Sequence, residues 1–149
     1  MSVGITKALQ DLLADSGADP QLFVQTFQHW KANWPENEYS NYFFGKDGAY
    51  AVPKVGGDKN KLRHVHLVPL CDQEALTLWE RAFRRLSRKT SDRALVYVDD
   101  GRGNYLLIFI LDEPDAHSIC RMENERDKSV MESFAIIAED FLFDGRISG

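Results

Sequence analysis

The strongest constraint on the fold is a pair of strand-like segments, residues 94–98 and 105–111, separated by a short polar turn. The first segment reads ALVYV, the second reads YLLIFIL, and the turn between them contains two glycines. Two β-rich runs around a glycine-bearing turn are typical of a β-hairpin. Because the second run is almost wholly apolar, we expect it to be a central strand buried on both faces.

A third strand is predicted for residues 62–68, which read LRHVHLV. Side chains alternate between the two faces of a strand, so His64 and His66 should share one face and Val65 and Leu67 the other. If the aliphatic face is buried, both histidines point outward. Arg63 precedes His64 and should therefore project to the opposite face from it.

Apolar residues recur at helical spacing in four further segments. These segments cover residues 5–13, 20–33, 73–88 and 130–141. Residues 36–60 lack clear periodicity, and we interpret them as loop with one short strand near residues 50–53. The element order is two helices, a strand, a helix, the hairpin and a last helix. This order predicts an α+β domain with a compact, mostly antiparallel sheet flanked by helices.

The length of the chain, its first residues and its cysteines lead us to expect a protein of the reducing cytoplasm. Its 149 residues fit one domain, and no apolar run is long enough to span a membrane. The first ten residues lack the basic and apolar regions of a secretory signal. Cys71 and Cys120 are far apart in the sequence, so neither a disulfide framework nor a cysteine zinc site is indicated.

Charge is unevenly distributed along the chain. The formal net charge of -5 alone argues against a nucleic-acid binder, because phosphate contact depends on positive surface. Six basic residues nevertheless crowd one short stretch: Arg81, Arg84, Arg85, Arg88, Lys89 and Arg93. A basic face on an acidic protein can still hold RNA.

Four ordered segments resemble the YafO family of mRNA interferases. They are FGKDGAY (44–50), LRHVHL (62–67), FRRLSRKTSD (83–92, leading into Leu95-Val96-Tyr97) and LLIFIL (106–111, with Pro114, His117 and Arg121 after it). One His-x-His pattern alone would carry no weight. The ordered blocks, which span roughly residues 43 to 141, are a specific signal.

The resemblance implies a type II toxin that cleaves mRNA on the ribosome and is held inactive by a cognate antitoxin. It also implies a fold akin to the RelE-like toxins. The chain departs from the pattern at its N-terminus, where two helices are predicted. We therefore expect a single toxin domain, 1–149, made of an N-terminal helical extension (1–40) and a YafO-like core (41–149).

Metal-independent RNA cleavage needs a base for the ribose 2'-hydroxyl, an acid for the leaving 5' oxygen and cations around the phosphate. His64 and His66 stand roughly 6 to 7 Å apart along the strand and could flank a phosphate. His117 follows the central strand and is expected beside them. We take all three as catalytic candidates. The competing interpretation is that the strand histidines cover hydrophobic neighbours and that His117 is a capping or surface residue.

The predicted RNA-binding residues are Arg84, Arg85, Arg88, Lys89, Arg121 and Tyr97. The first four could contact the backbone of messenger or ribosomal RNA, or could simply form a solvated helix face. Arg121 lies one helical turn past His117, so the two could share a phosphate. Tyr97 could stack on a base or pack in the core.

Two other classes of function fit parts of the sequence. The domain could be a binding module or a toxin that acts on a protein such as a topoisomerase, with the basic helix as its interface. It could also be a metal hydrolase that uses His64, His66 and His117, although no carboxylate or cysteine pattern supports a metal site. We expect no metal and no cofactor.

Overall fold

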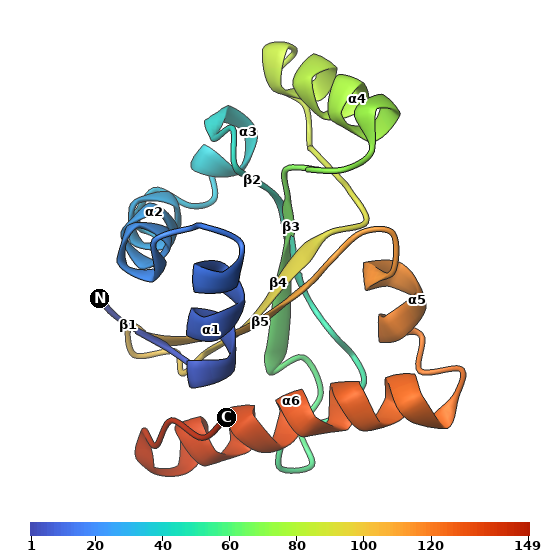
Figure 1. Ribbon diagram of the computed structural model, residues 1–149. Coiled ribbons are helices and arrows are strands. Elements are labelled where there is room, and N and C mark those ends of the chain that lie inside the picture. The colour runs from blue at the N-terminus through green and yellow to red at the C-terminus, as the bar shows by residue number, and fades with distance from the viewer.

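A five-stranded mixed sheet forms the centre of the computed structural model, which describes residues 1–149 (Figure 1). The strands are β1 (Ser2–Ile5), β2 (Phe44–Ala49), β3 (Leu62–Leu67), β4 (Ala94–Asp99) and β5 (Asn104–Leu111). Their order across the sheet is β1-β5-β4-β3-β2. β1 pairs with β5 in parallel, and the other three pairs are antiparallel. The α+β class and the β4–β5 hairpin predicted from the sequence are confirmed.

Helices cover both faces of this sheet. They are α1 (Lys7–Asp15), α2 (Pro20–Ala32), α3 (Asn37–Ser40), α4 (Gln73–Arg84), α5 (Ala116–Cys120) and α6 (Glu125–Asp144). In Figure 1, α1 and α2 lie on one side of the sheet and α6 runs across the other, while α4 stands away from the layers. None of the helices combines the length and the apolar character needed to cross a membrane.

β5 supplies side chains to both hydrophobic layers. Leu106 and Ile108 pack with the apolar residues of α6, whereas Leu107 and Ile110 pack with those of α1 and α2. All four side chains are at most 4% exposed. The prediction of a central strand buried on both faces is therefore confirmed.

Local signals in the sequence place the helix ends. Asp19 accepts a hydrogen bond from the Gln21 backbone N–H at 2.9 Å, and Pro20 occupies the first turn of α2. Asn124 caps α6 in the same way, and Gly145, with φ of 77°, ends it in the left-handed conformation. The four predicted helices are confirmed, although the helix predicted for residues 73–88 ends at Arg84.

The prediction for residues 36–60 is wrong in part, because the strand lies at 44–49 instead of 50–53. The glycines of β2 favoured the prediction of a loop. In the structure, Gly45 allows β2 to pass close to the backbone of Lys89. A Cβ atom at Gly45 would lie 2.3 Å from the Lys89 carbonyl oxygen. The four-residue β1 was also missed, since its apolar residues precede α1 and resemble the start of that helix.

A buried polar cluster ties α2 to the sheet on the side of α1 and α2. The Asp47 carboxylate is fully buried and accepts from Lys31 Nζ at 2.9 Å, Arg63 Nη2 at 3.0 Å and the Tyr97 hydroxyl at 2.7 Å. Lys31 also donates to the Tyr97 hydroxyl at 3.0 Å. Each buried charge thus has a partner, which a low-dielectric interior requires.

Replacing Asp47 by Asn should lower the free energy of unfolding by about 3–5 kcal/mol, because Lys31 and Arg63 lose their counter-charge inside the protein. Urea denaturation checks this. A matched control is Asp11→Asn, which removes the exposed Lys7–Asp11 pair, whose side chains are 81% and 61% exposed. The control should cost less than about 1 kcal/mol. Equal losses in the two variants would contradict the importance of the buried cluster.

Candidate active site

Three histidines from two distant parts of the chain meet beside the end of β3. His64 and His66 come from β3, and His117 comes from α5, the short helix after β5. The ring centroids of His64 and His66 are 5.9 Å apart, and those of His66 and His117 are 5.6 Å apart. The structure thus brings together all three residues that we proposed as catalytic.

His64 packs against an aromatic ring. Its ring stacks on Tyr50 with a centroid distance of 4.2 Å and an interplanar angle of 17°. Its Nδ1 atom is buried and has no hydrogen-bond partner in the protein. Burial, with the neighbouring His66 as a second cause, lowers the pKa of His64 to about 4. The ring is therefore neutral near pH 7.

His66 lies on the same face of β3 as His64, as predicted, but does not point into open solvent. Its side chain is only 7% exposed. Nδ1 lies 3.0 Å from the Ser91 backbone nitrogen and 2.8 Å from the Ser91 carbonyl oxygen. Either tautomer, and the protonated ring, can therefore form a hydrogen bond there. Burial is the main cause that lowers the pKa of His66.

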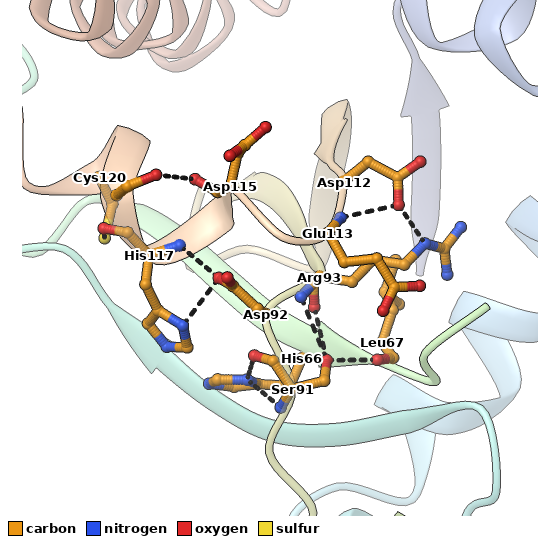
Figure 2. Close-up of polar contacts among 11 residues, drawn as sticks. His66, Leu67, Ser91, Asp92, Arg93, Asp112, Glu113, Asp115, His117 and Cys120 are labelled. Atoms are coloured by element: carbon orange, nitrogen blue, oxygen red, sulfur yellow. Dashed lines mark hydrogen bonds and ion pairs between the residues drawn. The ribbon is translucent and has the colours of Figure 1, made fainter. Parts of the chain in front are cut away.

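Asp92 holds His117. One carboxylate oxygen of Asp92 accepts from the His117 backbone N–H at 2.7 Å and lies 2.9 Å from Nδ1 of the ring (Figure 2). The His117 side chain is 54% exposed, and no protein group forms a hydrogen bond with Nε2. The Asp92 contact thus fixes the ring by Nδ1 and leaves Nε2 available.

The segment between α4 and β4 connects the two histidines. Ser91 contacts His66, and Asp92 contacts His117. The Ser91 hydroxyl donates to the Leu67 carbonyl oxygen and accepts from the Arg93 N–H, which holds the segment against the end of β3. Figure 2 shows these contacts side by side.

Lys46 is the exposed cation that acts on the cluster, whereas Arg121 follows His117 by four positions and lines a separate groove. Lys46 is exposed on β2, and its charge contributes to the lowered pKa of His66. Arg121 is exposed directly after α5 and lines an open groove with residues 52–54 and α6. Sequence reasoning proposed Arg121 but missed Lys46, because residues 44–49 were interpreted as loop. Asp92 was also missed, since only the fold places it beside His117.

Arg84, Arg85 and Arg88 have a different placement from the histidines. Arg84 and Arg85 are exposed at the end of α4, and no hydrogen bond or ion pair joins them to the cluster. Arg88 is half-exposed, and its Nε atom lies 3.0 Å from the buried Glu38 carboxylate. All three remain accessible to a partner, but their surface is separate from the histidine cluster.

Two of the predicted RNA-binding residues need correction. Tyr97 is fully buried, and its hydroxyl donates to Asp47, so it packs in the core instead of stacking on a base. Lys89 is also fully buried and donates from Nζ to the Glu38 carbonyl oxygen at 3.0 Å. Burial lowers its pKa to about 8. We therefore remove both residues from the RNA-binding set.

Arg63 projects away from the histidines, as strand alternation predicted, and binds Asp47 in the buried cluster. No group of three or more His, Cys, Asp or Glu side chains in the structure is arranged to hold a metal ion. The site is thus a cluster of imidazoles supported by a carboxylate and a backbone segment, with the exposed cation Lys46 acting on it.

The fold and this site define a small α+β protein with a histidine cluster suited to proton transfer. A comparison with protein-family models matches residues 28–143 to the family described as Toxin YafO, type II toxin-antitoxin system. The match covers well over half of the chain, so the protein belongs to the YafO toxin family. It begins inside α2, earlier than the predicted boundary at residue 41. Searches among curated proteins and among solved structures found no match.

The low pKa of His64 predicts a specific pH dependence of stability. The unfolded chain takes up a proton on this residue below about pH 6.5, whereas the folded protein does so only near pH 4. The free energy of unfolding should therefore fall as the pH is lowered from about 6.5 to 4, by up to about 3 kcal/mol from His64. Urea denaturation at several pH values checks this. His64→Phe should flatten the slope, and an unchanged slope in that variant would contradict the assignment.

Proposed function

We propose that the protein is a toxin that blocks translation by cutting mRNA on the ribosome, with His66 and His117 as base and acid. The observation that carries the proposal is the approach of the two rings to 5.6 Å, with a fixed hydrogen-bond partner for Nδ1 of each. Membership of the YafO toxin family supports the toxin role. The resemblance implies the mRNA target and the ribosome.

His66 is the proposed base. When its Nδ1–H donates to the Ser91 carbonyl oxygen, Nε2 carries no proton and can accept one. The lowered pKa keeps the ring neutral near pH 7. His66 would take the proton of the ribose 2'-hydroxyl as that oxygen forms a bond to the adjacent phosphorus. The Ser91 carbonyl oxygen would then stabilise the imidazolium.

His117 is the proposed acid. The bond to Asp92 orients Nδ1–H, and Nε2–H then faces the substrate. As the bond from phosphorus to the 5' oxygen breaks, Nε2 gives its proton to that oxygen. The products are a 2',3'-cyclic phosphate or, after hydrolysis, a 3'-phosphate, and a fragment with a 5'-hydroxyl. The proton balance needs no metal ion.

His64 has a supporting place in this scheme. It stays neutral at pH 7, so it adds no repulsion when His66 becomes protonated beside it. Its stacking on Tyr50 also fixes the wall of the site. We therefore assign His64 to the wall of the site and not to proton transfer.

Cations must balance the charge that develops on the phosphate. Lys46 is an exposed cation that acts on His66, and Arg121 is exposed one helical turn after His117; we propose that both contact the phosphate. Arg84, Arg85 and Arg88 would contact RNA further away. Because the chain has a net charge of -5 and only two cations are proposed at the site, it should bind free RNA weakly. The ribosome would then hold the mRNA at the site. We further propose a cognate antitoxin partner and kinship with the RelE-like fold.

Replacing His66 or His117 by Ala should lower mRNA cleavage by about 10²–10⁴-fold, because each variant removes one proton-transfer group. Cleavage of mRNA in a reconstituted translation reaction, with analysis of the fragment ends, measures this. His29→Ala is the matched control, since His29 is exposed on α2. A zinc-selective chelator, which spares the Mg²⁺ that ribosomes need, should leave cleavage unchanged. Full activity in both site variants, or a 3'-hydroxyl end, would refute the assignment.

The cellular target can be tested separately. Pulse-labelling after induced expression should show that protein synthesis falls before DNA synthesis, because the proposed substrate is translated mRNA. An uninduced culture and the His117→Ala variant serve as controls. If DNA synthesis stops first, the toxin acts on a target such as a topoisomerase and the ribosomal proposal fails.

A further inference from the structure

α4 is attached to the rest of the protein by a narrow strip of its surface. Trp79 is its one buried residue, and its indole nitrogen donates to the Tyr42 carbonyl oxygen at 2.8 Å. Phe83 packs against the Tyr42 ring, and Lys89 Nζ lies over the rings of Trp79 and Phe83. In Figure 1, α4 projects beyond the end of β3, away from the other helices.

The outward side of α4 combines a leucine with arginines. Leu78 is 56% exposed. Arg81 and Arg85 follow it by three and seven positions, so all three side chains share one face of the helix. Both arginines are exposed, and neither takes part in an ion pair within the protein. Glu74, four positions before Leu78, adds one exposed carboxylate to this face. The surface is therefore amphipathic, with its positive charge toward the C-terminal end of α4.

Leu86 is a second exposed leucine, directly after Arg85 and beyond the last turn of α4. It is 63% exposed and adopts a left-handed backbone conformation with φ of 52°. The Ser87 N–H donates to the Ala82 carbonyl oxygen at 2.9 Å, which closes the helix end in the manner that usually places glycine at this position. A leucine is strained there and buries little, so the fold itself gives no reason for it.

We propose that Leu78, Arg81, Arg85 and Leu86 form a docking surface for an acidic amphipathic helix of the antitoxin. This inference rests on the proposed function, which supplies an antitoxin as the partner. Carboxylates on such a helix would pair with the arginines, and its apolar stripe would cover the two leucines. An RNA backbone would pair with the arginines but would leave the leucines exposed, so the leucines favour a protein partner. Docking here would also cover Arg84 and Arg88.

The first experiment measures binding of the full-length toxin to the purified protein encoded by the gene beside the toxin gene. Leu78→Glu places a negative charge at the centre of the surface and should weaken binding by about tenfold or more. Leu22→Glu is the matched control, because Leu22 is 60% exposed on α2 and lies outside the surface. It should bind like the wild type. Leu22→Glu should also keep the mRNA cleavage activity of the wild type. Cleavage by Leu78→Glu is measured as a separate readout, because Arg85, a proposed RNA contact, lies on the same face.

The second experiment separates docking from folding. Leu86→Gly relieves the backbone strain, so it should raise the melting temperature while weakening the partner's binding. Asn60→Gly is the matched control: Asn60 is also left-handed, with φ of 64°, and exposed. It should leave binding unchanged. A substitution that stabilises the toxin and still weakens the complex cannot act through misfolding.

The outcomes distinguish this proposal from the proposed function. Unchanged binding in both Leu78→Glu and Leu86→Gly would overturn the docking surface, as would failure of the neighbouring protein to bind the wild-type toxin. If Leu78→Glu lowers mRNA cleavage but not binding of the partner, the surface contacts RNA and the proposal is wrong. If the toxin cuts no mRNA but both variants weaken the complex, the docking surface stands and the proposed activity fails.

Discussion

The alternation of side chains along β3 is the constraint on which the other features depend. Val65 and Leu67 enter the aromatic layer beneath α1 and α2, and Arg63 on the same face neutralises the buried Asp47. The intervening positions deliver His64 and His66 to the opposite face. A shift of one residue in the pairing would bury the histidines among aromatic side chains and expose the aliphatic ones. The hydrophobic layer thus fixes the position of the proposed catalytic groups.

The segment containing Ser91 and Asp92 completes the site by linking β3 to His117. It contacts His66 through the backbone of one residue and His117 through the side chain of the next. Burial keeps His64 and His66 uncharged near pH 7, while His117 remains accessible beside a carboxylate. The site therefore holds buried, neutral imidazoles next to an exposed one. The proposed cleavage needs one group that accepts a proton and one that donates a proton.

Features set by local periodicity could be predicted from the sequence. Features set by pairing between segments far apart in the chain could not. The period of two in β3 predicted that the histidines share a face and that Arg63 does not. The resemblance led to His117. Lys46 was missed because the pairing of β2 with β3 brings it to the histidines. Asp92 was missed because the path of the segment between α4 and β4 brings it to His117. Tyr97 and Lys89 carry polar atoms typical of a surface, yet both are buried because buried partners satisfy those atoms. No local pattern reveals such partners.

The most direct test of the paired acid and base is the pH dependence of single-turnover mRNA cleavage on the ribosome. We expect the wild-type rate to fall at acidic pH, because His66 must be neutral to accept the proton of the 2'-hydroxyl. The residual activity of His66→Ala should lose this acidic limb, and that of His117→Ala should keep it. If the acidic limb persists in His66→Ala, His66 is not the base.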